Sequence, residues 1–409
     1  MDTFNSGRQS KMVILGCFDS KSEEFEYLYS CLKELNVEVF TINTGVRSTE
    51  VNFHIDVSAE EVAKAAGYEL STISKLIQRG EILEIMGLGA QEIVSELKDK
   101  INILGAIGMG GGGGTYLTIM AMQALPFGIP KICISTVATK DLSRQIGAKD
   151  IVMIPSIVDL AGLNSISRKV ISQAASAILG MANAKQPKEA YTKKTIAISM
   201  FGNTTECVNY CSDLLKAKGY EVLCFHAVGS GGRTMEALIE DGLIDAVLDI
   251  TITELADELC GGICSAGPER LETAGKVGIP QVVVPGCLDM VNFAQLDTVP
   301  KKYADRLLFN WAPDVTLMRT DKAENIALGS LIASKLNRSK GKATILLPLK
   351  GISIVSSEGN LFYAPETDKA LFDTIKSKVN NNITIREVNF NINDIAFAKE
   401  AVDSILELI

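Results

Sequence analysis

One pattern runs along the whole sequence: short, almost wholly apolar runs alternate with longer amphipathic stretches. Strands that are apolar at nearly every position are typical of a parallel sheet, because helices cover both of its faces. The pattern therefore predicts an α/β protein with doubly wound, Rossmann-like parallel sheets. Ser58 and Glu61 form the spacing of a capping box, which predicts a helix start. The clearest apolar runs are residues 12–18, 37–42, 101–109 and 131–135.

The pattern stops once and then restarts. Residues 184–194 are rich in lysine and polar residues and are typical of a linker, and 409 residues exceed the usual size of one domain. We expect a polar tail at 1–10, one Rossmann-like domain at 11–183 and a second at 195–409, facing each other across a cleft. The second domain should end with strands near 342–351 and 383–389 and a helix at 394–409.

The two predicted domains follow a similar order of elements. Residues 195–232 repeat the strand, polar turn, helix, strand and glycine turn of residues 11–45. Later, "GIPKICIST" at 128–136 is matched by "GIPQVVVPG" at 278–286. The similarity is one of order and spacing more than of identity, so an internal duplication is a hypothesis.

Composition and charge exclude several classes of protein. The formal net charge is −9 and there is one Trp, which argues against nucleic acid as a partner. The sequence has neither an apolar run of about 18 residues nor a basic segment leading into one, so we expect a cytoplasmic protein that does not enter membranes. The nine cysteines are an odd number and scattered, which favours reduced thiols.

A run of five glycines is the most specific local feature. Gly110, Gly111, Gly112, Gly113 and Gly114 follow an apolar run and precede Thr115. Glycine lets the backbone turn tightly, so that several N–H groups can point at one anion. A helix beginning at Thr115 would add its positive dipole end. The run thus predicts a phosphate site, the alternative being a turn that permits close helix packing.

The sequence defines less clearly which phosphate compound would bind. Gly108, Gly110 and Gly113 fit G-x-G-x-x-G, but no acidic residue follows about 20 residues later to hold a ribose, which argues against NAD. No lysine precedes Thr115, so the run is not a Walker loop either. Backbone amides and hydroxyl groups would have to hold the phosphates.

A second glycine turn lies in the C-terminal half. Gly229, Gly231 and Gly232 precede Arg233, whose guanidinium suits a phosphate or carboxylate. Polar residues near expected strand ends offer further chemistry: His226, Glu254 and Asp289 are candidate proton-transfer groups, and Asp249 is a candidate ligand for Mg²⁺. The alternatives are a solvated arginine, a structural histidine and carboxylates that cap helices.

Several segments resemble a known family. They include "GAIGMGGGGGT", "MIPSIVDLAGLNSIS", "FHAVGSGGRTMEALI", "VLDITITELADELCGG" and "PGCLDMVNF". The family is the N-terminal ATP-binding domain of the plant tobamovirus-resistance protein with its bacterial relatives, and the similarity extends from about residue 11 to the C-terminus. The resemblance implies two Rossmann-like subdomains, a homodimer, and ATP with Mg²⁺ near the glycine-rich loop. It also implies these phosphate neighbours: Gly110 to Gly114, Thr115, Ser135, Thr136 and, facing them, Gly231, Gly232 and Arg233.

The resemblance gives a ligand more than a reaction. In the plant protein the domain is fused to a TIM barrel, so a separate TIM-barrel protein is a candidate partner. Our main expectation is a soluble ATP- and Mg²⁺-binding protein of unassigned reaction, its phosphates held between the lobes. The alternatives are an enzyme acting on a small phosphorylated or carboxylated metabolite through Arg233 with His226, Glu254 or Asp289, and a binding module that the nucleotide stabilises.

Overall fold

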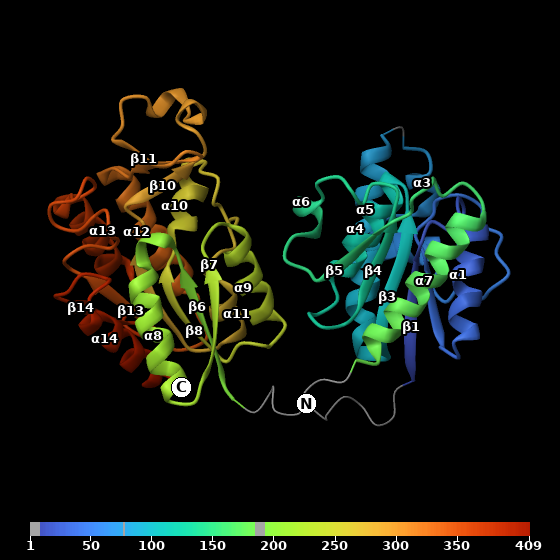
Figure 1. Cartoon of the computed structure of the whole chain (residues 1–409), viewed down its shortest axis with the longest axis horizontal. Coiled ribbons are helices and arrows are strands. Elements are labelled where there is room, and N and C mark those ends of the chain that lie inside the picture. Colours follow the sequence, from blue (N-terminus) through green and yellow to red (C-terminus); the bar gives the residue numbers. More distant parts are fainter. Residues whose placement is uncertain (1–8, 77, 185–192) are drawn as a thin grey trace. The chain divides into compact units, whose positions relative to one another are not determined.

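The computed structural model describes residues 9–76, 78–184 and 193–409. The chain divides into two compact units, unit 1 (Met1–Lys188) and unit 2 (Glu189–Ile409) (Figure 1). The tail expected at 1–10 and the linker expected at 184–194 fall mostly outside the described residues. Within those residues, no helix has the length and apolar character needed to cross a membrane.

Unit 1 is a five-stranded parallel sheet with strand order β2-β1-β3-β4-β5. The chain order of its elements is β1 (Ser10–Gly16), α1 (Ser22–Glu34), β2 (Val39–Asn43), α2 (Ala59–Ala65), α3 (Leu70–Ile73), α4 (Arg79–Lys100), β3 (Asn102–Gly110), α5 (Gly112–Gln123), β4 (Lys131–Ser135), α6 (Ser143–Ile146), β5 (Ile151–Pro155) and α7 (Ser165–Ala182).

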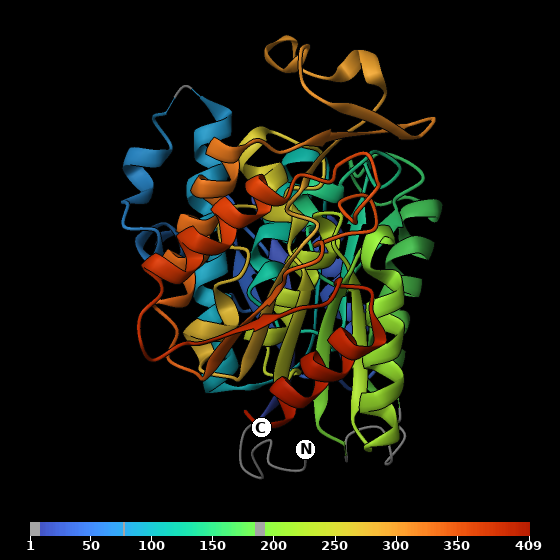
Figure 2. The same cartoon turned by 90° about the vertical axis from the view of Figure 1, so that its left-hand side faces the viewer.

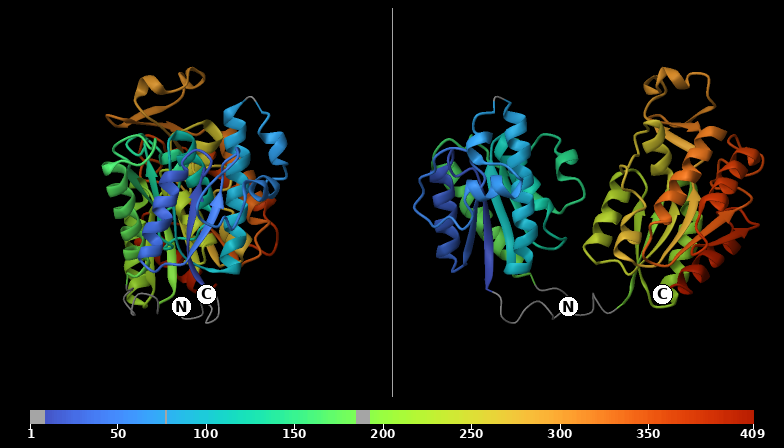
Figure 3. Two further views of the ribbon diagram at one scale, coloured as in Figure 1. Left: turned by 90° about the vertical axis from the view of Figure 1, so that its right-hand side faces the viewer. Right: turned by 180° about the vertical axis from the view of Figure 1, so that it is seen from behind.

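Alternate residues of the central strands enter two separate cores. In β1, Val13 and Leu15 pack with α2, α4 and α5, whereas Met12 and Ile14 pack with α1 and α7. Helices therefore cover both faces of the sheet, and α1 and α4 lie on opposite sides of it (Figure 3). This two-sided burial explains why the strands are apolar at most positions.

The helix starts test two local predictions. Ser58 accepts a hydrogen bond from the Glu61 N–H while Glu61 accepts one from the Ser58 N–H, so the predicted capping box is confirmed. The expectation that Thr115 begins the next helix is wrong. Helix α5 begins at Gly112, so its first turn contains three glycines. Because glycine disfavours helices, the sequence pattern placed the start too late.

Unit 2 has a six-stranded parallel sheet, with order β14-β13-β9-β8-β6-β7. Its main elements in chain order are β6 (Thr195–Met200), α8 (Thr205–Ala217), β7 (Glu221–His226), α9 (Ser230–Glu240), β8 (Ala246–Thr251), α10 (Thr253–Cys260), α11 (Thr273–Val277), β9 (Gln281–Gly286), β10 (Met290–Phe293), β11 (Leu308–Ala312), β12 (Val315–Arg319), α12 (Lys322–Leu336), β13 (Ala343–Pro348), α13 (Pro365–Lys378), β14 (Thr384–Val388) and α14 (Ile395–Leu406).

Both faces of this sheet are buried as well. Helices α8 and α14 pack on one face, against Ile196 and Ile198 of β6 among others. Helices α9 and α11 pack on the other, against Ala197 of β6, and α10, α12 and α13 continue that layer over β9 and β13. The strands and the closing helix expected after residue 341 are confirmed as β13, β14 and α14.

The two sheets share a strand order. Numbered by their own chain order, the first five strands of each main sheet follow the order 2-1-3-4-5, and unit 2 adds a sixth strand. The sequence pattern did not predict the antiparallel sheet β10-β12-β11, which lies between β9 and α12 in the chain (Figure 2). These strands are short, so they change the alternation of strands and helices along the sequence only slightly.

Candidate functional site

The strand order of unit 1 fixes where a crevice can form. From β1 the chain goes to β2 on one side and then returns to β3 on the other, so the order reverses between β1 and β3. Such reversal points open a crevice at the carboxyl ends of the strands. A cavity of about 270 Å³ lies there. Its lining is Cys17, Ser20, Lys21, Arg79, Leu83, Met109, Gly110, Gly111, Gly113 and Gly114.

The glycine-rich loop forms one wall of this cavity. Strand β3 ends at Gly110, Gly111 is the N-cap, and α5 starts at Gly112. A Cβ on Gly110 would lie 2.7 Å from the Cα of Gly114, so the tight turn requires glycine there. The first N–H groups of α5 have no partner within the helix and carry its positive dipole end. The wall can therefore accept an anion through its backbone.

Thr115 and Ser135 lie behind the loop. Their hydroxyl oxygens are 2.7 Å apart, both side chains are buried, and neither lines the cavity. Strand β3 pairs with β4 so that Gly110 is opposite Ser135, and the Thr136 N–H donates to the Gly110 carbonyl. Thr136 itself is exposed. These predicted phosphate neighbours thus position the loop against β4.

Two cationic side chains in the lining were missed by the sequence reasoning. Lys21 precedes α1 and donates to the Leu160 carbonyl, and Arg79 is the first residue of α4. Arg79 packs over the loop, since a Cβ on Gly113 would lie 3.1 Å from its Nη2. No hydrogen bond or ion pair engages the Arg79 guanidinium within the described parts of the chain. The position of Lys21 shortly after the first strand could have indicated that it lies at the carboxyl edge of the sheet. No feature of the sequence indicated that Arg79 lies there.

The chemistry of the cavity suits an anion. Its lining contains Lys21 and Arg79 but no carboxylate. Burial raises the pKa of the Cys17 thiol, and a hydrogen bond to Thr44 only partly opposes this, so the thiol stays protonated and uncharged. The side chains that line the cavity therefore carry a net positive charge.

The second glycine turn binds a side chain of the protein itself. Glu254 Oε1 accepts the N–H groups of Gly229 at 2.8 Å and Gly232 at 3.1 Å. A Cβ on Gly232 would lie 2.2 Å from Glu254 Oε2, and one on Gly231 would lie 1.9 Å from the His226 carbonyl oxygen. The glycines here make room for protein atoms. In this conformation the turn binds the Glu254 carboxylate where a phosphate was expected.

Arg270 links two of the predicted carboxylates in the interior of unit 2. It is fully buried and bonds to both oxygens of Asp249, at 2.6 and 2.7 Å, and through Nε to Glu254 at 2.6 Å. Burial raises the pKa of Glu254 although Arg270 opposes the shift. The guanidinium occupies the position that Mg²⁺ would need beside Asp249. Across the described residues, no group of three or more His, Cys, Asp or Glu is placed to hold a metal ion.

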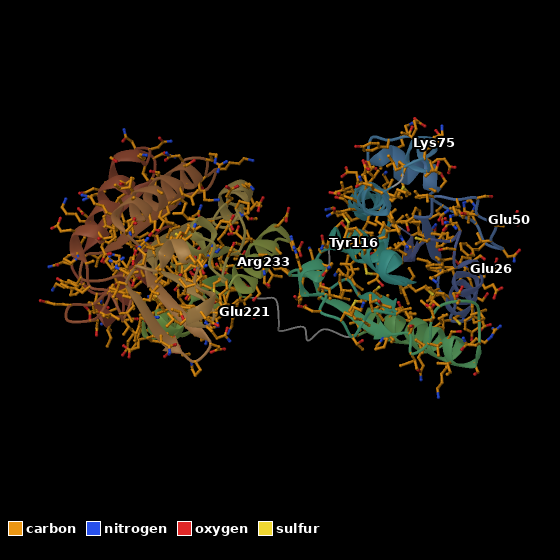
Figure 4. The ribbon with its side chains drawn as sticks, turned by 90° about the horizontal axis from the view of Figure 1, so that it is seen from above. Glu26, Glu50, Lys75, Tyr116, Glu221 and Arg233 are labelled. Atoms are coloured by element: carbon orange, nitrogen blue, oxygen red, sulfur yellow. The ribbon has the colours of Figure 1, made fainter. Side chains whose placement is uncertain are left out.

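The remaining candidates of unit 2 are separated from one another. Asp289 is fully buried, accepts a hydrogen bond from Ser353, and has its pKa raised to about 6 by burial. His226 is exposed at the end of β7, an edge strand, with its ring 5.6 Å from that of Phe201. Arg233 lies on the surface of α9 and donates to the Ser265 carbonyl (Figure 4). No described contact joins these three side chains.

Family comparisons cover both units. Residues 10–187 match the N-terminal domain, and residues 193–409 the C-terminal domain, of the uncharacterised protein family UPF0261. The chain belongs to the UPF0261 family. A UPF0261 protein of Clostridium tetani is 46% identical over 389 residues, which are 95% of this chain and 96% of that protein.

Plant proteins are also related to this UPF0261 chain. The ToMV resistance protein Tm-1(GCR237) of tomato, Solanum lycopersicum, is 35% identical over 419 residues, which cover 97% of this chain and 56% of the tomato protein. The expected relationship to the plant tobamovirus-resistance family is thus confirmed. Among solved structures, Acinetobacter baumannii MurG covers 98% of the chain at 11% identity and a TM-score of 0.23, too low to support an inference.

Proposed function

We propose that unit 1 binds ATP, with its phosphates in the cavity between the ends of β1 and β3. The observation that carries this proposal is the combination of the glycine loop with Lys21 and Arg79 around one cavity free of lining carboxylates. The resemblance to the ATP-binding plant domain supplies the identity of the nucleotide. The reaction stays unassigned, and the homodimer and a TIM-barrel partner are parts of the proposal that rest on that resemblance alone.

Each group around the cavity would contribute to phosphate binding in a different way. Backbone N–H groups of the loop and of the first turn of α5 would hold phosphate oxygens at fixed positions. Arg79 would add two parallel N–H donors and Lys21 a point charge. Thr115 and Ser135 would keep the loop rigid from behind. A preformed receptor of this kind loses little entropy when it binds.

Magnesium would enter with the nucleotide. No carboxylate lines the cavity, and Mg²⁺ in nucleotide sites is commonly held by phosphates, waters and few protein ligands. In this proposal the ion neutralises phosphate charge and Asp249 takes no part, since Arg270 occupies it.

The metabolite-enzyme alternative has less support. Glu254 and Asp289 are buried, and neither lines a described cavity with Arg233 or His226. Moving a proton to a substrate requires hydrogen-bond reach, which the described conformation does not provide. A nucleotide-stabilised binding module stays compatible with the same ATP site.

Isothermal titration with ATP, ADP and NAD⁺, with and without Mg²⁺, tests the proposal. We expect ATP to bind, and Arg79→Ala to weaken it by about 10- to 100-fold, the usual effect of one charged hydrogen-bond donor. Lys100→Ala removes a cation from the other end of α4, where it pairs with exposed Glu96, and is the matched control. Absence of ATP binding to folded protein, or equal loss in both variants, would refute the assignment.

A further inference from the structure

A second cavity lies beside the first in unit 1. Its volume is about 600 Å³, and it is bounded by the loop after β2, the start of α2, and α3. Ligand sites for small molecules typically measure about 300–1,000 Å³, so the first cavity, at about 270 Å³, is small for a whole nucleotide. A nucleotide whose phosphates occupy the first cavity must place its nucleoside elsewhere.

Two segments of chain connect the cavities. Ser20 and Lys21 line the first, while the preceding Asp19 accepts hydrogen bonds from the N–H groups of Val46 and Arg47 in the wall of the second. Farther along, Leu70 lines the second cavity and Arg79 the first. The loop after β1 thus lines the first cavity and is hydrogen-bonded to a wall of the second, while the helices α3 and α4 each contribute to one cavity.

The lining of the second cavity differs from that of the first. Val46, Ile55 and Leu70 offer an apolar surface suited to the face of a base. Glu60 and Glu69 add carboxylates, which no hydrogen bond or ion pair engages among the described residues. Ribose hydroxyls donate well to such carboxylates. The two carboxylates outnumber Arg47, the one cation in this lining, so the cavity is less suited to a triphosphate than the first.

We propose that the second cavity binds the nucleoside of the same nucleotide, with its base against Val46, Ile55 and Leu70 and its ribose near Glu60 or Glu69. This inference rests on the proposed ATP site. The carboxyl end of β2 is adjacent to that of β1, so a ligand can extend along the sheet edge from one cavity to the other.

The test compares ATP with inorganic tripolyphosphate, which has phosphates but no nucleoside. Ser71→Trp should partly fill the second cavity, because Ser71 lines it from α3. We expect this variant to weaken ATP by about tenfold or more and to change tripolyphosphate affinity less than twofold. Thr72→Trp, on the same short helix but outside the lining, is the matched control and should bind both like the natural chain.

The outcomes separate the two proposals. Arg79→Ala should weaken ATP and tripolyphosphate alike, because both need the first cavity. If ATP binds and Ser71→Trp leaves its affinity unchanged, the nucleoside assignment fails while the phosphate site stands. If neither compound binds the natural chain, the proposed function fails and the nucleoside assignment with it. Circular dichroism checks folding, and should Ser71→Trp not fold, Glu69→Ala carries the test through selective loss of ATP affinity.

Discussion

At the scale of single residues, identical glycines serve different neighbours. A Cβ on Gly112 would meet no atom within 4 Å, whereas one on Gly113 would meet Arg79 and Leu83. Gly232 in unit 2 accommodates Glu254. A run of glycines therefore does not define which positions face a ligand; the side chains brought against each position define that.

Gly113→Asp should lose most ATP affinity, by about 10-fold or more, because the new carboxylate would pair with Arg79 and repel phosphate. Gly112→Asp should lose less, since Gly112 does not line the cavity. Calorimetric titration of both folded variants measures the difference. Equal losses would contradict this placement, and a larger loss for Gly112→Asp would place the phosphates on the Gly112 side.

Arg270→Met should lower the free energy of unfolding by about 3–5 kcal/mol, because Asp249 and Glu254 would remain buried without their partner. Arg338→Met is the control: its ion pair with Glu272 is largely exposed on the arginine side and should cost less than about 1 kcal/mol. Urea denaturation of the two variants gives the comparison. A small effect of Arg270→Met would mean that the interior carboxylates are already protonated.

At the scale of elements, α10 joins the main sheet of unit 2 to the small antiparallel sheet. Asp257 of α10 accepts hydrogen bonds from the N–H groups of Cys264 and Asn292, and Asn292 belongs to β10. Burial raises the pKa of Asp257 from 3.8 to about 7, although these hydrogen bonds lower it. The contact between α10 and the small sheet is therefore sensitive to pH.

The sign of this pH effect follows from proton binding. Between about pH 4 and 7 the folded chain holds a proton on Asp257 that the unfolded chain has released, so stability should decrease as pH rises through that window. Asp289, with a pKa raised to about 6, acts in the same direction. Urea denaturation at pH 5 and pH 8 should show a smaller decrease for Asp257→Asn than for the natural chain, and identical decreases would contradict the shift.

Element order also weakens the sequence argument against NAD. The rule that places an acidic residue about 20 positions after the glycines applies to a loop that follows the first strand. Here the loop follows β3, and the carboxylates near the second cavity, Glu60 and Glu69, precede it in the chain. Titration with NAD⁺ therefore belongs in the first experiment.

At the scale of the whole molecule, each unit has its own sheet and its own cores. We expect residues 1–188 and 189–409, expressed separately, to unfold cooperatively, and 1–188 to bind ATP within about threefold of the full chain. Calorimetry of both fragments and of the full chain measures this. Loss of binding in the folded fragment would show that unit 2 contributes to the site, as the residues Gly231 to Arg233 were expected to do.

The sequence by itself determined the fold class, the positions of most strands, and the glycine turn that follows β3. These follow from local rules: strands buried on two faces must be mostly apolar, and only glycine permits the turn at Gly110. Tertiary structure alone decided that Arg79 lines the same cavity as the loop. It also decided that Arg270 forms hydrogen bonds with Asp249 and Glu254, which are therefore not free to bind a ligand. Strand order brings together side chains distant in the sequence, and burial then decides which charges must pair with the protein.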